Sequence, residues 1–284
     1  MTSDQPLPPS QQTQPAQPDT HAALTSYRID DPLFQVCILS GFEAAPASDA
    51  LSLMLVGGGA VQYYAWSPNL RRPTNDVDLQ HKAYAPKSVR HAWGTFAQQS
   101  LERYGYTGAY KHTKTGGELR ICGSKPLFFL HLDLYTPRFS KRYAKRIAAE
   151  FERSETLVLP GKTDGIEYRV EEPEDVLGYK ISRLIGAATQ GVLSPEDART
   201  VALLKDGLVD DVVVDDLETR LQRVLEKRML SLELVDRIGE ETLQRAIMSY
   251  RDAKNIYDVL LLVESSRKLG RPLDKTIICQ HFDL

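Results

Sequence analysis

The hydrophobic pattern of this 284-residue chain changes near residue 171, and this change constrains the fold more than any other feature. Upstream, short runs of strand character alternate with helical stretches. Downstream, apolar residues recur with the 3.6-residue period of helices, separated by glycine, proline and serine. The strand-like runs are LMLVG, DVDLQ, ELRICG, LFFLHLDLY, TLVLP and IEYRV. We therefore expect an α/β (α+β) fold, with a small mixed β-sheet flanked by helices over residues 27–170 and a helical domain over residues 171–284.

The amino-terminal segment and the overall charge limit how the chain can bind its partners. Residues 1–26 are rich in proline and glutamine and nearly free of apolar side chains, which predicts a disordered tail. The formal net charge of −3 gives no overall attraction to polyanions, so nucleotide or nucleic-acid binding needs local patches and bound cations. Three scattered cysteines and the lack of a long apolar run predict a cytoplasmic protein with no membrane role.

Three consecutive glycines, Gly57, Gly58 and Gly59, follow the apolar run LMLV, and a helix can start directly after them at Ala60. Glycine lets the backbone approach a ligand closely, and the free amides at a helix start favour phosphate. The same residues would also make a tight strand-to-helix turn that binds nothing, which is the commoner use of an isolated glycine run. The glycines alone leave both interpretations open.

Two aspartates, Asp76 and Asp78, share one face of the predicted strand DVDLQ, because side chains alternate along a strand. Carboxylates this close repel each other, which raises a pKa unless a divalent cation lies between them. Asp133 lies on the polar face of LFFLHLDLY beside His131, which we expect to pack or hydrogen-bond rather than bind metal. If the two strands are neighbours, Asp76, Asp78 and Asp133 form a site for two metal ions. The alternatives are a solvated strand end and an aspartate that binds a loop.

A strand, a Gly-Gly turn that opens a helix, a D-x-D strand and a later strand with a third aspartate form a known pattern. In this respect the sequence resembles the nucleotidyltransferase superfamily (DNA polymerase beta-like). The segments LVGGGAVQYYA, RRPTNDVDL and EEPEDVLGYKISRLIGAA are similar to the AbiEii/AbiGii-type toxin nucleotidyltransferase family of bacterial abortive-infection and toxin-antitoxin systems. The matching positions are Gly57, Gly58, Ala60, Arg72, Thr74, Asp76, Asp78, Asp175 and Lys180. Where that family usually has serine or threonine to contact a nucleotide phosphate, this chain has Gly59.

The resemblance implies a magnesium-dependent transfer of a nucleoside monophosphate from a nucleoside triphosphate to an acceptor hydroxyl, with RNA and tRNA ends favoured as acceptors. It implies two Mg²⁺ ions, or Mn²⁺ in their place, held by Asp76, Asp78 and Asp133, with Lys180 offsetting charge on the leaving pyrophosphate. The implied nucleotide-binding residues are Gly57, Gly58, Gly59, Arg72, Thr74, Lys180 and Asp197. A catalytically inactive binding or interaction protein on the same fold is the alternative.

Three polar positions of the helical half each have a simpler explanation. Lys180 falls at the edge of the apolar stripe of its predicted helix, where it could neutralise phosphates or only cover apolar surface with its stem. Asp197 could supply an acid to the site or only complete a helix cap with Ser194. Lys254 and Asp258 are four residues apart, which predicts a surface ion pair.

Basic residues cluster just beyond Asp133, in the run RFSKRYAKR. Such a run is usually a solvated helix face, but next to the third carboxylate it could hold an RNA backbone or a triphosphate. The candidates for contact with RNA or tRNA are Arg138, Lys141, Arg142, Lys145 and Arg146. The sequence indicates no particular protein partner.

Overall fold

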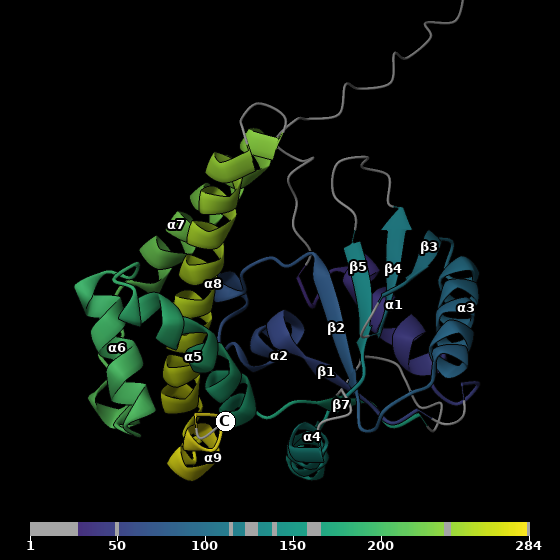
Figure 1. Cartoon of the computed structure of the whole chain (residues 1–284), viewed down its shortest axis with the longest axis horizontal. Helices are drawn as coiled ribbons and strands as arrows, with labels where there is room; N and C mark the ends of the chain where they lie inside the picture. The colour runs from purple at the N-terminus through teal and green to yellow at the C-terminus, as the bar shows by residue number, and fades with distance from the viewer. Residues whose placement is uncertain are drawn as a thin grey trace, which may run out of the picture.

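The computed structural model describes residues 28–48, 51–113, 116–122, 130–137, 141–157, 166–235 and 240–282, so the expected tail and Arg138 lie outside the described residues. The sheet within this part of the chain is mixed, with the strand order β3-β4-β5-β2-β1-β7-β6 (Figure 1). β2 pairs with β5 in parallel and β1 pairs with β7 in parallel, while the remaining neighbours are antiparallel. The strands are β1 (Leu53–Val56), β2 (Asp76–His81), β3 (Thr107–His112), β4 (Gly116–Cys122), β5 (Leu130–Tyr135), β6 (Glu155–Thr156) and β7 (Arg169–Val170).

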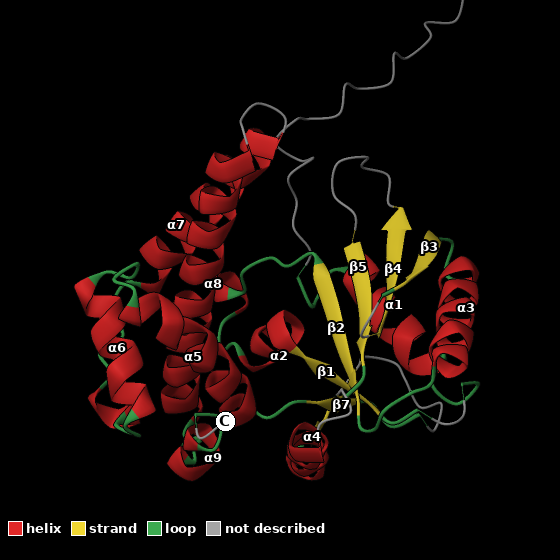
Figure 2. Cartoon of the chain, viewed as in Figure 1, coloured by secondary structure: helices red, strands yellow, loops and turns green. Residues whose placement is uncertain are grey.

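The helices divide into those that lie around the yellow strands in Figure 2 and those that follow residue 171, which gather to one side of the sheet. The first set contains α1 (Pro32–Glu43), α2 (Gly57–Tyr64), α3 (Lys87–Arg103) and α4 (Lys141–Arg153). The second set contains α5 (Pro173–Thr189), α6 (Pro195–Lys205), α7 (Leu217–Val235), α8 (Glu240–Leu269) and α9 (Lys275–Cys279). Short 3₁₀ turns lie at Pro68–Leu70 and Val209–Asp211. The expected fold class, a mixed sheet with flanking helices followed by a helical region, is confirmed.

The two faces of the sheet differ in the way the alternation of β2 and β5 predicts. Leu130, Leu132 and Leu134 are buried, and Gly41 of α1 lies directly against the side chains of Leu79 and Leu132. α1 therefore covers the apolar face, and the polar residues of both strands point to the opposite face. Since burying a leucine side chain contributes about 1.5–3 kcal/mol, this packing fixes which face of each strand is left for polar residues.

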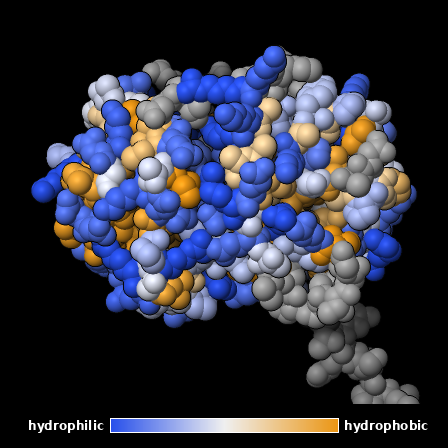
Figure 3. All heavy atoms as spheres, turned by 90° about the horizontal axis from the view of Figure 1, so that it is seen from below, coloured by the Kyte–Doolittle hydropathy of each residue, from blue (hydrophilic) through white to orange (hydrophobic). Residues whose placement is uncertain are grey.

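One hydrophobic core joins the sheet to the helical region. It includes Leu79 of β2, Leu177 of α5 and Leu260 of α8. The predicted domain boundary near residue 170 stays a prediction. Hydrophilic side chains predominate on the face shown in Figure 3, with apolar ones scattered among them. Within the described part of the chain, no helix is long and apolar enough to cross a membrane.

Two local expectations were wrong. α2 begins at Gly57 and not at Ala60, because Gly57 adopts a φ of 64° that turns the chain at once and brings Gly58 and Gly59 into the first helical turn. β3 was not among the expected strands. Its residues alternate between exposed and half-buried with none fully buried, so the strand at this edge of the sheet lacks an apolar period.

Candidate active site

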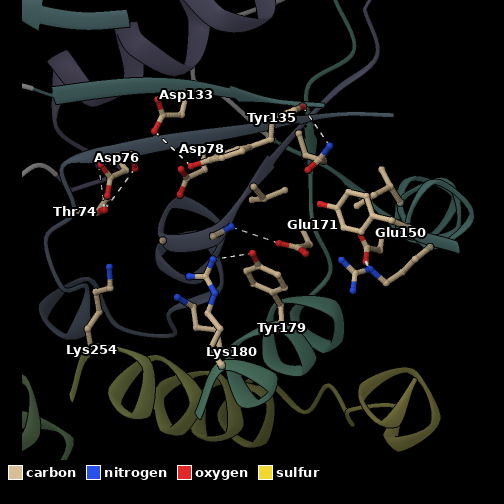
Figure 4. Close-up of a pocket in the computed structure, with 18 of the residues that line it drawn as sticks. Thr74, Asp76, Asp78, Asp133, Tyr135, Glu150, Glu171, Tyr179, Lys180 and Lys254 are labelled. Atoms are coloured by element: carbon tan, nitrogen blue, oxygen red, sulfur yellow. Dashed lines mark hydrogen bonds and ion pairs between the residues drawn. The ribbon is translucent and has the colours of Figure 1, made fainter. Parts of the chain in front are cut away.

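The parallel pairing of β2 with β5 brings three aspartates to one place. In this register Asp78 lies opposite Asp133, and Asp76 lies opposite His131. Asp76, Asp78 and Asp133, called here the aspartate cluster, are all half-buried and all line one cavity of about 310 Å³ (Figure 4). This cavity is called the aspartate cavity below. His131 makes the hydrogen bond that was expected of it, to Glu118 at 2.8 Å.

Burial and repulsion by neighbouring acids disfavour the charged forms of Asp78 and Asp133. Burial and then the charge of Asp76 raise the pKa of Asp78 to about 6, while Lys254 and Lys180 oppose the shift. Burial and then Asp78 and Asp76 raise the pKa of Asp133 to about 7. Within the described residues, no ion pair compensates any member of the cluster.

The donor set of the cluster fits a magnesium ion. All its members offer carboxylate oxygens, the ligands that Mg²⁺ prefers, and they lie in a cavity beside each other without a cationic partner. The carboxylate oxygens of the three aspartates do not all lie within 4.8 Å of one another. In the described part of the chain, the residues that meet this criterion are Glu150, Asp175 and His281. Repulsion among uncompensated carboxylates explains why the three side chains stay apart.

Close neighbours leave little room for a side chain at Gly57, Gly58 and Gly59. A Cβ atom on Gly57 would lie 2.6 Å from Asp78 Oδ2, and one on Gly58 would lie 3.1 Å from Thr74 Oγ1, so side chains at these positions would fill the aspartate cavity. Gly59 does not line the cavity. A Cβ there would lie 2.8 Å from the side chain of Leu55, which makes Gly59 a packing position between α2 and β1.

Arg72, Lys180 and Asp258 form a second charged cluster, called here the Asp258 clasp. Asp258 of α8 is fully buried and accepts hydrogen bonds from Arg72 Nε at 2.5 Å and Nη2 at 2.7 Å, while Lys180 Nζ lies 2.6 Å away. Burial alone would raise the pKa of Asp258, but Arg72 and Lys180 lower it to about 2. Arg72, Thr74 and Lys180 all line the aspartate cavity, as their implied roles require.

The predicted surface pair of Lys254 and Asp258 is therefore wrong. Asp258 points to the interior because its face of α8 packs against α5, and Lys254 lines the aspartate cavity. Burial, followed by Arg72 and Lys180, lowers the pKa of Lys254 to about 8. A signal was available in the sequence, since Asp258 interrupts the buried apolar run from Ile256 to Val263 and an unpaired acid there would be costly.

Asp175 and Asp197 do not reach the aspartate cavity. Asp175, in the first turn of α5, is fully buried behind it and is bound by Arg153 at 2.6 and 3.1 Å and by His281 at 3.0 Å. The backbone N–H of Asp197 donates to Ser194 Oγ at 3.1 Å, so the helix cap is confirmed. The carboxylate of Asp197 pairs with Arg220 at 2.9 Å, in a different cavity formed by α6, α7 and α8.

Several lining residues were missed from the sequence. Glu171 is buried just after β7 and accepts a hydrogen bond from the Gly57 N–H at 3.4 Å. Burial and then Glu150 hold its pKa well above the usual range. The guanidinium of Arg183 lies 4.3 Å from the ring centre of Tyr179 and donates to its hydroxyl at 2.7 Å. The other missed lining residues are Val56, Gln80, Tyr135, Tyr143, Ile147 and Glu150.

The basic run after Asp133 forms part of α4. Lys141, Arg142 and Lys145 lie on this helix, and Arg146 lines the aspartate cavity, where it lies 3.0 Å from Glu150. One predicted RNA-contacting residue therefore belongs to the cavity wall.

Comparison with solved structures finds the antibiotic-resistance factor ANT(2'')-Ia, known from a solution structure. The match covers 84% of this chain and 96% of that chain, with 15% sequence identity and a TM-score of 0.33. A likeness at this level does not establish a shared fold. No protein-family model and no curated protein sequence matches the chain.

Proposed function

We propose that the chain is a divalent-cation-dependent nucleotidyltransferase that moves a nucleoside monophosphate from a nucleoside triphosphate to an acceptor hydroxyl. The observation that carries this proposal is the aspartate cluster itself: three uncompensated carboxylates on neighbouring strands, in one cavity with the glycine-rich start of a helix. A purely structural buried acid would have cationic partners within the chain, as Asp258 has in Arg72 and Lys180.

Asp76, Asp78 and Asp133 would hold the magnesium ions. When bound there, the ions would neutralise triphosphate charge and stabilise the attacking and leaving oxygens. The amides at the start of α2 would bind phosphate, and Lys180 and Lys254 would offset its negative charge from the helical side of the cavity. Asp133 would accept the proton of the acceptor hydroxyl.

The acceptor that we favour is the end of an RNA, tRNA in particular, in keeping with the resemblance to the AbiEii/AbiGii-type toxins. Lys141, Arg142 and Lys145 on α4 would meet the RNA backbone, and Arg146 would continue this positive surface into the cavity.

The test is transfer of label from each of the four nucleoside triphosphates to total RNA and to tRNA by the full chain, with Mg²⁺ or with EDTA. We expect labelled RNA with Mg²⁺ only, and loss of label to background in the Asp76→Ala/Asp78→Ala variant. The matched control is Asp210→Ala, which removes an exposed carboxylate that pairs with Lys275. Transfer that survives the loss of both aspartates would refute the enzyme proposal. Nucleotide binding without transfer to RNA, to small molecules or to protein would favour the inactive binding protein instead.

A further inference from the structure

Tyr135 brings a hydroxyl group of the chain itself to the aspartate cluster. It is the last residue of β5 and follows Asp133 by two positions, so both side chains point to the same face of the sheet. Its hydroxyl donates to Asp133 Oδ2 at 3.5 Å and also hydrogen-bonds the carboxylate of Asp78. Tyr135 is 40% exposed and lines the aspartate cavity, so a ligand in the cavity can reach its oxygen.

The other hydroxyl groups that line the cavity, those of Thr74, Tyr143 and Tyr179, are engaged differently, and Tyr143 hydrogen-bonds Arg146. Thr74 is 5% exposed, and its Oγ1 accepts from the backbone N–H of Asp76 at 3.3 Å. The hydroxyl of Tyr179 accepts a hydrogen bond from Arg183 at 2.7 Å. Tyr135 instead combines an exposed side chain with a hydrogen bond to the carboxylate that would take the proton of an acceptor.

The groups that would hold a triphosphate face Tyr135 across the cavity. Figure 4 shows Lys180 and Lys254 on the helical side, opposite Asp133 and Tyr135 on the sheet. Phosphates between these two walls would have cations on one side and the Tyr135 hydroxyl on the other. We propose that Tyr135 is itself an acceptor, so that the chain attaches a nucleoside monophosphate to its own tyrosine. This inference rests on the proposed function.

The transfer balances without any further reactant. The phenolic oxygen of Tyr135 attacks the α-phosphorus of the nucleoside triphosphate, and a P–O bond to the tyrosine forms. The bond from the α-phosphorus to the oxygen bridging to the β-phosphate breaks, and pyrophosphate leaves with that electron pair. The phenolic proton passes to the carboxylate of Asp133, which releases it to solvent.

The position of Tyr135 also sets the extent of the reaction. A nucleotide on this oxygen would lie next to Asp78 and Asp133, to which the hydroxyl is hydrogen-bonded, and would compete with a second triphosphate for the cluster. We therefore expect self-modification to stop at one nucleotide per chain and to slow transfer to other acceptors.

The test is incubation of the full chain with Mg²⁺ and each nucleoside triphosphate, followed by intact mass and peptide mass spectrometry. We expect a single nucleoside monophosphate on the peptide that contains Tyr135, and none in Tyr135→Phe. Tyr84→Phe, which changes a tyrosine 45% exposed outside the cavity lining, serves as the matched control and keeps the modification. Circular dichroism of Tyr135→Phe verifies that the variant folds. The initial rate per chain should not change with protein concentration, because the acceptor is intramolecular.

Three results would overturn the inference: a modification that persists in Tyr135→Phe, a rate per chain that rises with protein concentration, or an unmodified Tyr135 in a chain that labels RNA. The last result leaves the proposed function standing. Failure of the proposed function looks different, since the wild-type chain would then transfer nucleotide neither to RNA nor to itself.

Discussion

The aspartate cluster and the Asp258 clasp lie around the same cavity, but they differ in how their negative charge is balanced. In the clasp, one acid lies between Arg72 and Lys180 and its pKa is lowered to about 2. In the cluster, three acids face each other and the pKa values of Asp78 and Asp133 are raised to about 6 and about 7. The clasp is complete within the chain, whereas no ion pair balances the cluster within the described residues, and under the proposed function cations would balance it.

The difference shows which charges hold the molecule together. Asp258 joins α8 to α5 through Lys180 and to the segment before β2 through Arg72, so it ties the helical region to the sheet. The cluster contributes no such tie, and the raised pKa values of Asp78 and Asp133 mean that their charged forms oppose folding. Three experiments sharpen this contrast.

The largest expected effect comes from breaking the clasp. Asp258→Ala leaves Arg72 and Lys180 buried without their partner, which should lower the free energy of unfolding by about 3–5 kcal/mol. Urea denaturation measures this change. As a control, Asp210→Ala removes an exposed carboxylate and should leave the urea midpoint unchanged. Equal midpoints for wild type and Asp258→Ala would show that the clasp does not hold the regions together.

The cluster should respond to substitution in the opposite direction. The folded-state pKa of Asp78, about 6, exceeds its ordinary value of 3.8, so the folded protein binds this proton more tightly than the unfolded chain does. Its ionised form therefore destabilises the fold above about pH 6, and the penalty disappears as the pH falls toward 4. With EDTA present, Asp78→Asn should be about 1–3 kcal/mol more stable than wild type at neutral pH.

The pH dependence provides the control for that prediction. Denaturation at pH 7.5 and at pH 5 should show the gap between Asp78→Asn and wild type shrinking in acid. The stabilising effect of Asp258, by contrast, is fully present above its ordinary pKa of 3.8 and is lost only as the pH falls through about 2. If the difference in unfolding free energy between Asp78→Asn and wild type stays constant between the two pH values, the charge of Asp78 does not destabilise the fold.

The smallest expected effect is stabilisation by magnesium. An ion that binds only the folded chain, at ten times its Kd, stabilises it by about 1.4 kcal/mol. Thermal unfolding with increasing Mg²⁺ should therefore raise the Tm of the wild type. Asp76→Asn/Asp78→Asn should show no rise, while Asp258→Asn, which keeps the whole cluster, should still respond if it folds. A Tm rise of equal size in the double variant would show that Mg²⁺ does not bind at the aspartate cluster.

Sequence patterns predicted the local parts of this site well. The alternation in LHLDLY assigned Leu132 to the core and Asp133 to the open face, and the D-x-D spacing put Asp76 and Asp78 on one face. The same alternation also put Tyr135 beside Asp133. Patterns failed where a residue's environment comes from distant segments: Asp258 looked like a helix-surface residue, and Glu171 looked like part of a helix start.

The sequence by itself determined which side chains share a face of each strand and the Ser194 cap at which α6 begins, because these depend on residue spacing within short segments. Only the tertiary structure decided that β2 lies parallel to β5 with Asp78 opposite Asp133, and that α8 brings Asp258 to Arg72, 186 positions away. Such pairings depend on how the strands order themselves and on which helix faces the shared core buries. Packing over the whole chain determines the strand order and the buried helix faces, and no local periodicity encodes them.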